Sequence, residues 1–168
     1  MLKKVKVRNA KSSGGSFAIV ASRYNAQYVD AMLSAARTEL LRAGAKVRIV
    51  RVPGAFEIPV VAARLAEKNA ARSSRSSRSK HRPASRLSAI ICLGVIFQGE
   101  TSHAQHIGWG ITHALPQIQL KYQIPVIHGV FTFEKVKHAR VRCLGTKHNR
   151  GAEAAQTALE MARVMSHL

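Results

Sequence analysis

The residues best suited to chemistry form a short polar run, Gln98–His103, that directly follows an apolar stretch. A glycine in such a turn lets the backbone approach a ligand closely, and the first N–H groups of a following helix attract anions. Thr101 and Ser102 add hydroxyl donors, and the imidazole of His103 transfers protons near neutral pH. The run therefore predicts an anion site beside a proton-transfer group. An ordinary capped helix start with a surface histidine fits the same pattern and stays open.

Two further turns carry polar or aromatic side chains. Pro53–Glu57 follows an alternating stretch, and the carboxylate of Glu57 is suited to accept hydrogen bonds from substrate hydroxyls. Tyr24 offers an aromatic face for stacking on a heteroaromatic ring, with Asn25 beside it. The structural alternatives are that Glu57 only complements a helix N-terminus, that Phe56 only packs, and that Asn25 only caps the next helix.

Arg142 is the fourth candidate, at the end of the short helical pattern Glu134–Arg142. Its guanidinium is suited to bind a phosphate through two hydrogen bonds, although a solvated surface arginine fits the same position. Neither GxxxxGK[ST] nor GxGxxG occurs in the chain, which disfavours nucleoside triphosphate and dinucleotide chemistry.

The elements between these segments have to position them, and they alternate along the chain. Apolar or alternating runs predict strands at 16–22, 46–52, 88–97 and 125–131, and helical spacing predicts helices at about 26–43, 58–68, 103–122, 134–142 and 149–166. The pattern predicts an α/β domain, with three αβα layers around a central, mainly parallel four-stranded sheet of flavodoxin-like type. Ligands of such sheets gather at the carboxyl ends of the strands, where the polar segments lie.

Two finer expectations concern the later helices. Pro116 lies inside the pattern at 103–122, where a proline removes one backbone hydrogen bond and kinks a helix. In the last helix, we expect the inward-facing side chains to be Ala154, Ala158, Met161 and Val164 or Met165.

The chain of 168 residues carries a formal net charge of +19, a balance that favours anionic partners. Much of the excess falls in two segments, residues 1–15 and Asn69–Arg86. The first predicts a flexible basic tail. The second, rich in Ser and Arg, lacks apolar periodicity and buries too little to offset its ordering entropy, so we expect a disordered insertion at about 69–86. The remainder of 16–168 predicts a single domain.

Membrane insertion and secretion are not indicated. The apolar run Leu87–Phe97 is shorter than the about 20 residues that span a bilayer, and no apolar core follows the basic residues of the N-terminus. Cys92 and Cys143 lack metal-ligand spacing and predict two free thiols in a reducing compartment. We therefore expect a cytoplasmic protein with no membrane contact.

Five motifs, in this order, resemble those of the lumazine synthase family: SRYN, PGAFEIP, LGVIFQGETSHAQHI, IPVIHGVFTFE and NRGAEAAQTALEMA. They cover roughly Ser16 to Met165 apart from the basic insertion, and the ordered set is far more specific than any one motif. The resemblance implies condensation of 5-amino-6-ribitylaminouracil with 3,4-dihydroxy-2-butanone 4-phosphate in riboflavin synthesis, with loss of phosphate and water. It implies no metal or organic cofactor.

The resemblance also implies roles for individual residues. The ribitylaminouracil is expected at Tyr24, Asn25, Ala55, Phe56, Glu57, Val95, Ile96 and His128. The phosphate is expected at Gly99, Glu100, Thr101, Ser102 and Arg142. Arg142 is expected to reach in from a neighbouring subunit, and His103 is expected to be the catalytic proton shuttle. Gln98 and His128 depart from the family pattern, which more often has Arg and a ring-stacking Phe.

Assembly is implied by the same resemblance: a homo-pentamer, in some members packed into an icosahedral shell, and an association with riboflavin synthase. Two other function classes stay open, a catalytically inactive homologue that binds flavins or forms a shell, and a basic RNA-binding protein. Aromatic residues make up only 5% of the chain, which counts against RNA binding as the main role. Incidental, salt-sensitive RNA binding through the basic tail and insertion fits the charge.

Overall fold

The computed structural model describes residues 14–76, 86–146 and 148–168. Strands and helices alternate as expected, and their bounds are β1 Ser16–Ser22, α1 Ala26–Arg42, β2 Lys46–Val52, α2 Ile58–Ser76, β3 Leu87–Phe97, α3 His103–Tyr122, β4 Val126–Phe133, α4 Val136–Ala139, the π-helical turn η1 Arg140–Leu144, and α5 Arg150–Met165. The first two strands begin and end where the sequence predicted.

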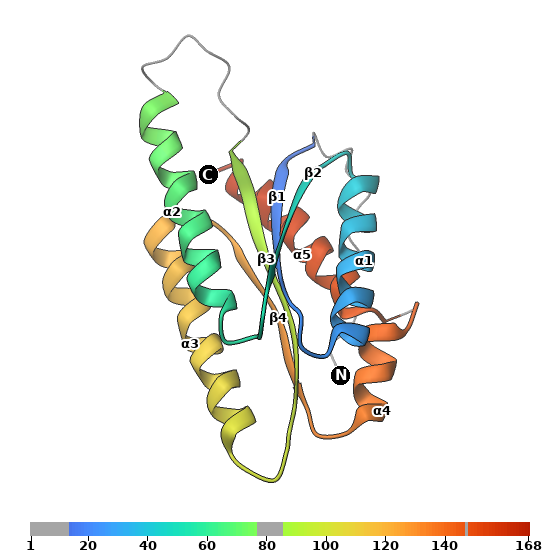
Figure 1. Cartoon of the computed structure of the whole chain (residues 1–168). Coiled ribbons are helices and arrows are strands. Elements are labelled where there is room, and N and C mark those ends of the chain that lie inside the picture. Colours follow the sequence, from blue (N-terminus) through green and yellow to red (C-terminus); the bar gives the residue numbers. More distant parts are fainter. Residues whose placement is uncertain (1–13, 77–85, 147) are drawn as a thin grey trace.

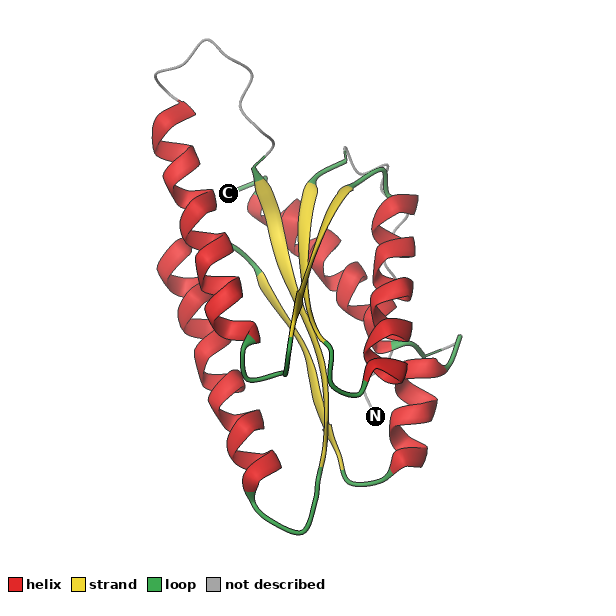
Figure 2. Ribbon diagram, in the orientation of Figure 1, coloured by secondary structure: helices red, strands yellow, loops and turns green. Residues whose placement is uncertain are grey.

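The four strands form one sheet in the order β2-β1-β3-β4, and every neighbouring pair is parallel. Helices α2 and α3 cover one face, and α1 and α5 cover the other (Figures 1 and 2). Each parallel pair needs a crossover connection, which the intervening helices supply. The predicted three-layer, flavodoxin-like α/β fold is thereby confirmed.

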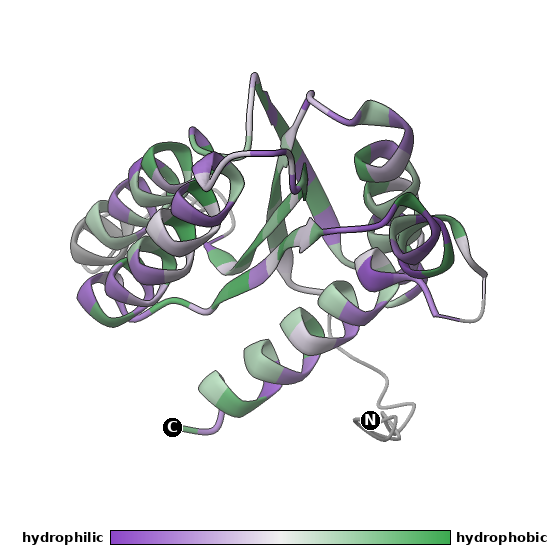
Figure 3. Ribbon diagram, turned by 90° about the horizontal axis from the view of Figure 1, so that it is seen from below, coloured by the Kyte–Doolittle hydropathy of each residue, from purple (hydrophilic) through white to green (hydrophobic). Residues whose placement is uncertain are grey.

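The core consists of two apolar layers, one on each side of the sheet. Ile19 and Ile91 belong to the layer beneath α1 and α5, and Val20 and Ile90 belong to the layer beneath α2 and α3; all four are fully buried. Seen from below, the strands lie between the two groups of helices and are coloured largely hydrophobic (Figure 3). Both faces of the sheet are therefore covered, as expected for strands that read as continuous apolar runs.

Helix α2 corrects the predicted boundary of the basic insertion. It continues to Ser76, whereas the sequence predicted its end at Lys68 and disorder from about residue 69. A tertiary contact supports the helix just beyond Lys68, because the buried side chain of Asn69 is hydrogen-bonded to the backbone of Leu87 at the start of β3. Residues 77–85 of the predicted insertion and residues 1–13 of the predicted tail lie outside the described part of the chain.

The later helices show smaller differences. Helix α3 continues through Pro116 to Tyr122. In α5, Ala154 and Ala158 are buried as predicted, and Met161 packs against the core. The inward orientation of Val164 or Met165 is wrong, because these side chains are 39% and 37% exposed where α5 runs past the core. The helix predicted at 134–142 is divided into α4 and η1.

Two other expectations bear on the class of protein. Both cysteines, Cys92 and Cys143, are free, as predicted, and both are buried. Burial raises the pKa of the Cys92 thiol to about 12, which makes it unreactive near neutral pH. Among the described residues, no helix has the length and apolar character needed to cross a membrane.

Candidate functional site

The turns that follow β1 and β2 are joined by backbone hydrogen bonds. The N–H of Arg23 donates to the carbonyl oxygen of Val52 at 2.9 Å, and the N–H of Tyr24 donates to that of Pro53 at 3.1 Å. The Tyr24 ring lies against Gly54, where an added Cβ would come within 3.1 Å of Cδ2. Glycine therefore lets the tyrosine ring rest on the neighbouring turn, while the side chain remains 71% exposed for a ligand.

Asn25 connects the first turn to the central strand β3. Its side-chain Nδ2 donates to the carbonyl oxygen of Val95 at 2.8 Å. The residue adopts the left-handed backbone conformation, with φ 57° and ψ 40°, which asparagine tolerates better than most residues. Asn25 occupies the N-cap position of α1, but its side chain makes no capping bond there, so capping is not what its amide does. Its amide instead fixes the position of the β1 turn.

The carboxylate of Glu57 closes the turn after β2. Its Oε2 accepts a hydrogen bond from the N–H of Gly54 at 2.8 Å, just before α2 begins. Ala55, in the same turn, packs against β3 at Gly94, where an added Cβ would lie 3.3 Å from that of Ala55. Phe56 rests against α3 yet is 61% exposed. The turn therefore presents both an aromatic face and a carboxylate at the edge of the sheet.

Gln98 organises the polar run between β3 and α3. Its backbone N–H donates to the carbonyl oxygen of Phe133, at 2.9 Å, and its side-chain Nε2 donates to the carbonyl oxygens of Thr101, at 2.7 Å, and Gly99, at 3.1 Å. Two carbonyl groups of the loop are thus held by one amide. An added Cβ at Gly99 would meet no described atom within 4 Å, so no packing contact requires the glycine, and the space is open to a ligand.

The N-terminus of α3 has no side-chain capping bond from its N-cap residue. Ser102 precedes the helix but makes no capping bond, and its Oγ lies 3.1 Å from Nε2 of His106. The N–H of His103 approaches Oγ1 of Thr101 at 3.4 Å. Among the described residues, no hydrogen bond restrains the exposed ring of His103, which leaves it able to exchange a proton with a bound molecule.

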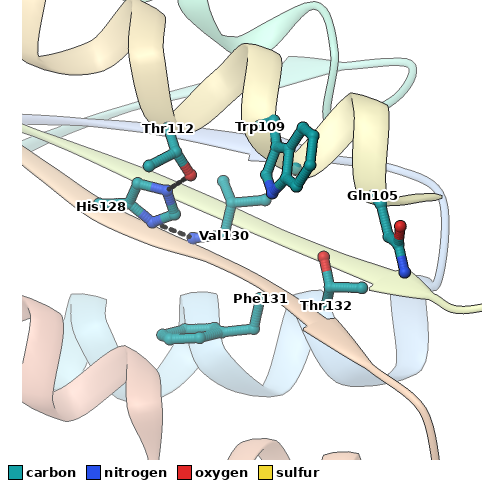
Figure 4. A pocket seen from close by; sticks show the side chains of 8 residues that line it. Gln105, Trp109, Thr112, His128, Val130, Phe131 and Thr132 are labelled. Atoms are coloured by element: carbon teal, nitrogen blue, oxygen red, sulfur yellow. Dashed lines mark hydrogen bonds between the residues drawn. The ribbon is translucent and has the colours of Figure 1, made fainter. Parts of the chain in front are cut away.

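His128 does not lie with the other site residues. It lies in β4, on the side that faces α3, with Nε2 at 3.1 Å from Oγ1 of Thr112. Desolvation by its surroundings lowers the pKa of His128, partly opposed by a backbone hydrogen bond. The side chain borders a pocket of about 300 Å³ between α3 and β4 (Figure 4), lined by Gln105, Gly108, Trp109, Thr112, His128, Val130, Phe131 and Thr132.

Arg142 is also separate from the polar run. It is exposed in η1, a segment that packs beside α1, and within the described residues its guanidinium forms no ion pair or hydrogen bond. One chain therefore brings together the turns after β1, β2 and β3, whereas His128 and Arg142 lie on other surfaces.

Sequence reasoning missed the hydrogen-bonding role of Gln98 and the α3 side chains around His128. Helical spacing already contained part of that signal, because Gln105, Trp109 and Thr112 recur at intervals of four and three residues. Trp109 is the single tryptophan of the chain and is 64% exposed, which is unusual for so large a side chain. For metals, no group of three or more His, Cys, Asp or Glu side chains comes together in the described residues.

Comparisons with known proteins bear on the whole chain. The family model described as 6,7-dimethyl-8-ribityllumazine synthase matches residues 14–166. Proteins named 6,7-dimethyl-8-ribityllumazine synthase are similar over most of their length. One from Stenotrophomonas maltophilia (strain K279a) is 37% identical over 155 residues, which is 90% of either chain. Another from Xylella fastidiosa (strain M12) is 35% identical over 161 residues, 94% of either chain.

Proposed function

The chain belongs to the 6,7-dimethyl-8-ribityllumazine synthase family, and on this premise we propose which of its residues carry the reaction. Its activity is that of a lumazine synthase in riboflavin biosynthesis. The reaction joins 5-amino-6-ribitylaminouracil to 3,4-dihydroxy-2-butanone 4-phosphate and releases phosphate and water. The observation that carries the residue assignment is the joining of three strand ends: backbone bonds connect the turns after β1 and β2, and Asn25 connects the turn after β1 to Val95 of β3. Glu57 and Gln98 hold the turns after β2 and β3 from within.

The pyrimidine substrate is assigned to the turns after β1 and β2. The exposed ring of Tyr24 provides a stacking face, and Glu57 provides a carboxylate for the ribityl hydroxyls. Asn25 keeps the tyrosine turn against β3. The remaining contacts are assigned to neighbouring residues at the same edge: Ala55, Phe56, Val95 and Ile96.

The phosphate is assigned to the loop that Gln98 holds. Backbone N–H groups at the start of α3, with the positive end of the helix dipole, favour a dianion there. The residues involved are Gly99, Glu100, Thr101 and Ser102. Donors that stabilise the departing phosphate lower the barrier for its elimination.

The chemistry then follows from holding two reactants together. The aromatic amine attacks the ketone and, with loss of water, forms an imine; phosphate leaves, and the ribitylamino nitrogen closes the ring with loss of a second water. Because the amine is already a competent nucleophile, proximity supplies much of the acceleration. His103, exposed at the start of α3, is the group assigned to move protons during these steps.

We assign His128 and Arg142 to the site of an adjoining copy in a homo-pentamer. The support is geometric, since neither side chain lies near the turns after β1, β2 and β3 of its own chain. In addition, His128 is carried by β4, the outermost strand on one side of the sheet. Large apolar side chains of α3, of α2 and of the turn before α2 are exposed, as expected for a surface that another copy covers. They are Phe56, Val60, Trp109 and Leu120.

A direct absorbance assay of product formation tests the residue assignment. Lumazine absorbance is followed with both substrates for the wild-type chain, Arg142→Ala and the control Arg140→Ala, which removes another exposed arginine of η1. We expect only Arg142→Ala to raise KM for the butanone phosphate, by about tenfold or more, because it removes charge-assisted hydrogen bonds. An unchanged KM and kcat in Arg142→Ala would remove this residue from the phosphate site.

Co-expression tests the shared site. If Arg142 acts in the adjoining copy, mixed oligomers of Arg142→Ala and Glu57→Gln chains contain some intact sites, about a quarter for random mixing at equal amounts. Activity should therefore exceed that of either variant alone. Mixed oligomers no more active than the separate variants would place Arg142 outside the neighbouring site, and native mass spectrometry gives the number of copies directly.

A further inference from the structure

The pocket between α3 and β4 has Trp109 and Gln105 on its α3 side and His128 and Thr132 on its β4 side (Figure 4). The ring of Phe131 lies on the opposite face of β4, toward α5. Helix α3 approaches β4 closely at Gly108, where an added Cβ would lie 3.1 Å from Oγ1 of Thr132. The pocket therefore brings side chains of α3 next to the face of β4 that carries His128.

His128 lines this pocket, and both of its ring nitrogens have a hydrogen-bond partner. The backbone N–H of Val130 donates to Nδ1 at 3.4 Å, so Nδ1 carries no proton in this arrangement. The neutral ring then carries its proton on Nε2, which donates to Oγ1 of Thr112 at 3.1 Å. Two groups on different elements thereby define the plane and the tautomer of one imidazole. The lowered pKa of His128 agrees with a neutral ring.

We propose that Thr112 is a positioning residue, whose hydroxyl fixes the imidazole of His128 as a flat face for the pyrimidine ring of the substrate. The inference rests on the proposed role of His128 in the site of an adjoining copy. Thr112 itself need not touch the substrate, since its hydroxyl contacts the ring of His128.

The physical reason is the freedom of the ring. Rotation about the bond between Cβ and the imidazole has a broad, roughly twofold profile, so an imidazole without partners samples many planes. Fixing that plane before binding avoids the entropy cost of ordering it when the substrate arrives. A phenylalanine, which the family more often has at this position, presents the same face whichever way it flips and needs no such hydrogen bond.

Steady-state kinetics of Thr112→Val test the proposal, because valine keeps the shape and removes the hydroxyl. We expect KM for the ribitylaminouracil to rise about threefold to tenfold, the effect of losing one orienting hydrogen bond. The kcat and the KM for the butanone phosphate should stay within about twofold of wild type. Thr112→Ser should behave as wild type, and Thr38→Val, which removes an exposed hydroxyl of α1, should change nothing.

The route through His128 is tested by the double variant. In a His128→Phe background, Thr112→Val should have no further effect, because the ring no longer needs a partner. The proposal is overturned if Thr112→Val matches wild type, if it alters kcat and both KM values together, or if it costs as much in the His128→Phe background as in wild type.

A measurement without substrate separates this inference from the proposed function. The exchange of the Nε2 proton of His128 with water, followed by NMR of ¹⁵N-labelled histidine, reports whether Thr112 holds the ring, because Oγ1 of Thr112 accepts that proton while the N–H of Val130 keeps it on Nε2. We expect Thr112→Val to speed this exchange without changing the tautomer. If Thr112→Val speeds the exchange, but neither His128→Ala nor Thr112→Val changes any kinetic constant, the contact stands and the role of His128 in the site fails. An exchange rate unaffected by Thr112→Val sinks the positioning role itself.

Discussion

The side-chain amide of Asn69 is hydrogen-bonded to both backbone polar groups of Leu87. The N–H of Leu87 donates to Oδ1 at 2.7 Å, and Nδ2 donates to the carbonyl oxygen of Leu87 at 3.3 Å. Asn69 lies in α2 and is 6% exposed, so the pair is shielded from water. A helix side chain thereby acts toward the first residue of β3 much as a neighbouring strand would.

Removing this pair should destabilise the fold and spare catalysis. Asn69→Ala leaves the N–H and carbonyl of Leu87 without their partner, and we expect the free energy of unfolding to fall by about 1–3 kcal/mol. Urea unfolding measures the change, with the neighbouring exposed Lys68→Ala as control. The kcat should be unchanged, because Leu87 begins β3 and the proposed site lies at the other end of this strand. Equal losses of stability in the two variants would show that the pair contributes nothing.

Asn25 should distinguish backbone strain from a lost hydrogen bond. Asn25→Ala removes the bond to Val95 and also places alanine at φ 57°, where it costs about 1–2 kcal/mol more than glycine. Asn25→Gly removes only the bond. We expect both variants to raise KM for the ribitylaminouracil, with alanine the less stable of the two in thermal unfolding. If the glycine variant were as unstable as the alanine variant, the left-handed conformation would not be the cause.

Gln98 should control use of the phosphorylated substrate. Gln98→Ala frees the carbonyl groups of Gly99 and Thr101, and we expect KM for the butanone phosphate to rise by about threefold to tenfold. The KM for the ribitylaminouracil should change little. Gln117→Ala, an exposed glutamine of α3, serves as control. An equal rise in KM for both substrates would contradict this prediction, because it would indicate that Gln98→Ala disturbs all three turns and not only the loop between β3 and α3.

His103 should be helpful to the reaction without being indispensable. Because proximity supplies much of the acceleration, we expect His103→Ala to lower kcat by about tenfold to a hundredfold, at or below the lower end of what acid–base groups contribute. His113→Ala, on the same helix, is the control. Turnover of His103→Ala indistinguishable from wild type would exclude the proton-transfer role.

Acid should destabilise the wild-type fold in part through His128. Burial lowers the pKa of this ring from the ordinary value of 6.5, so in the acidic range just below that value the unfolded chain binds a proton that the folded chain does not. Stability is therefore unaffected by His128 above about pH 6.5 and falls as the pH drops from there toward the lowered pKa. Urea unfolding at pH 7.5 and 5.5 should show a smaller loss for His128→Phe than for wild type. Identical losses in the two proteins would contradict this.

Local sequence patterns predicted most of the fold. The apolar run at Ser16–Ser22 and the alternation at Lys46–Val52 fixed two strands at their true ends, because side-chain periodicity and flanking turns are local signals. The alternation of strands and helices then predicted a parallel sheet. Because the carboxyl ends of parallel strands lie at the same end of the sheet, the sequence also predicted that Asn25, Glu57 and Gln98 follow the strands at that end.

The differences came from contacts between elements distant in sequence. The pairing of Asn69 with Leu87, which supports α2 beyond Lys68, leaves no periodic trace in a run of serines and arginines. The bond from Asn25 to Val95 spans 70 residues, and local capping preference suggested a different partner. The contact of Thr112 with His128 likewise joins a helix to a strand. Such pairings become visible only when the elements are placed together.

The length of α2 separates its two ends electrostatically. The helix begins directly after the turn that carries Glu57, and its 19 residues rise about 28 Å to Ser76 (Figure 1). At physiological ionic strength, a charge is screened over about 8 Å, so Ser76 lies several screening lengths from the start of the helix. A change of charge at the end of α2 should therefore leave the electrostatic potential at the Glu57 turn almost unaltered.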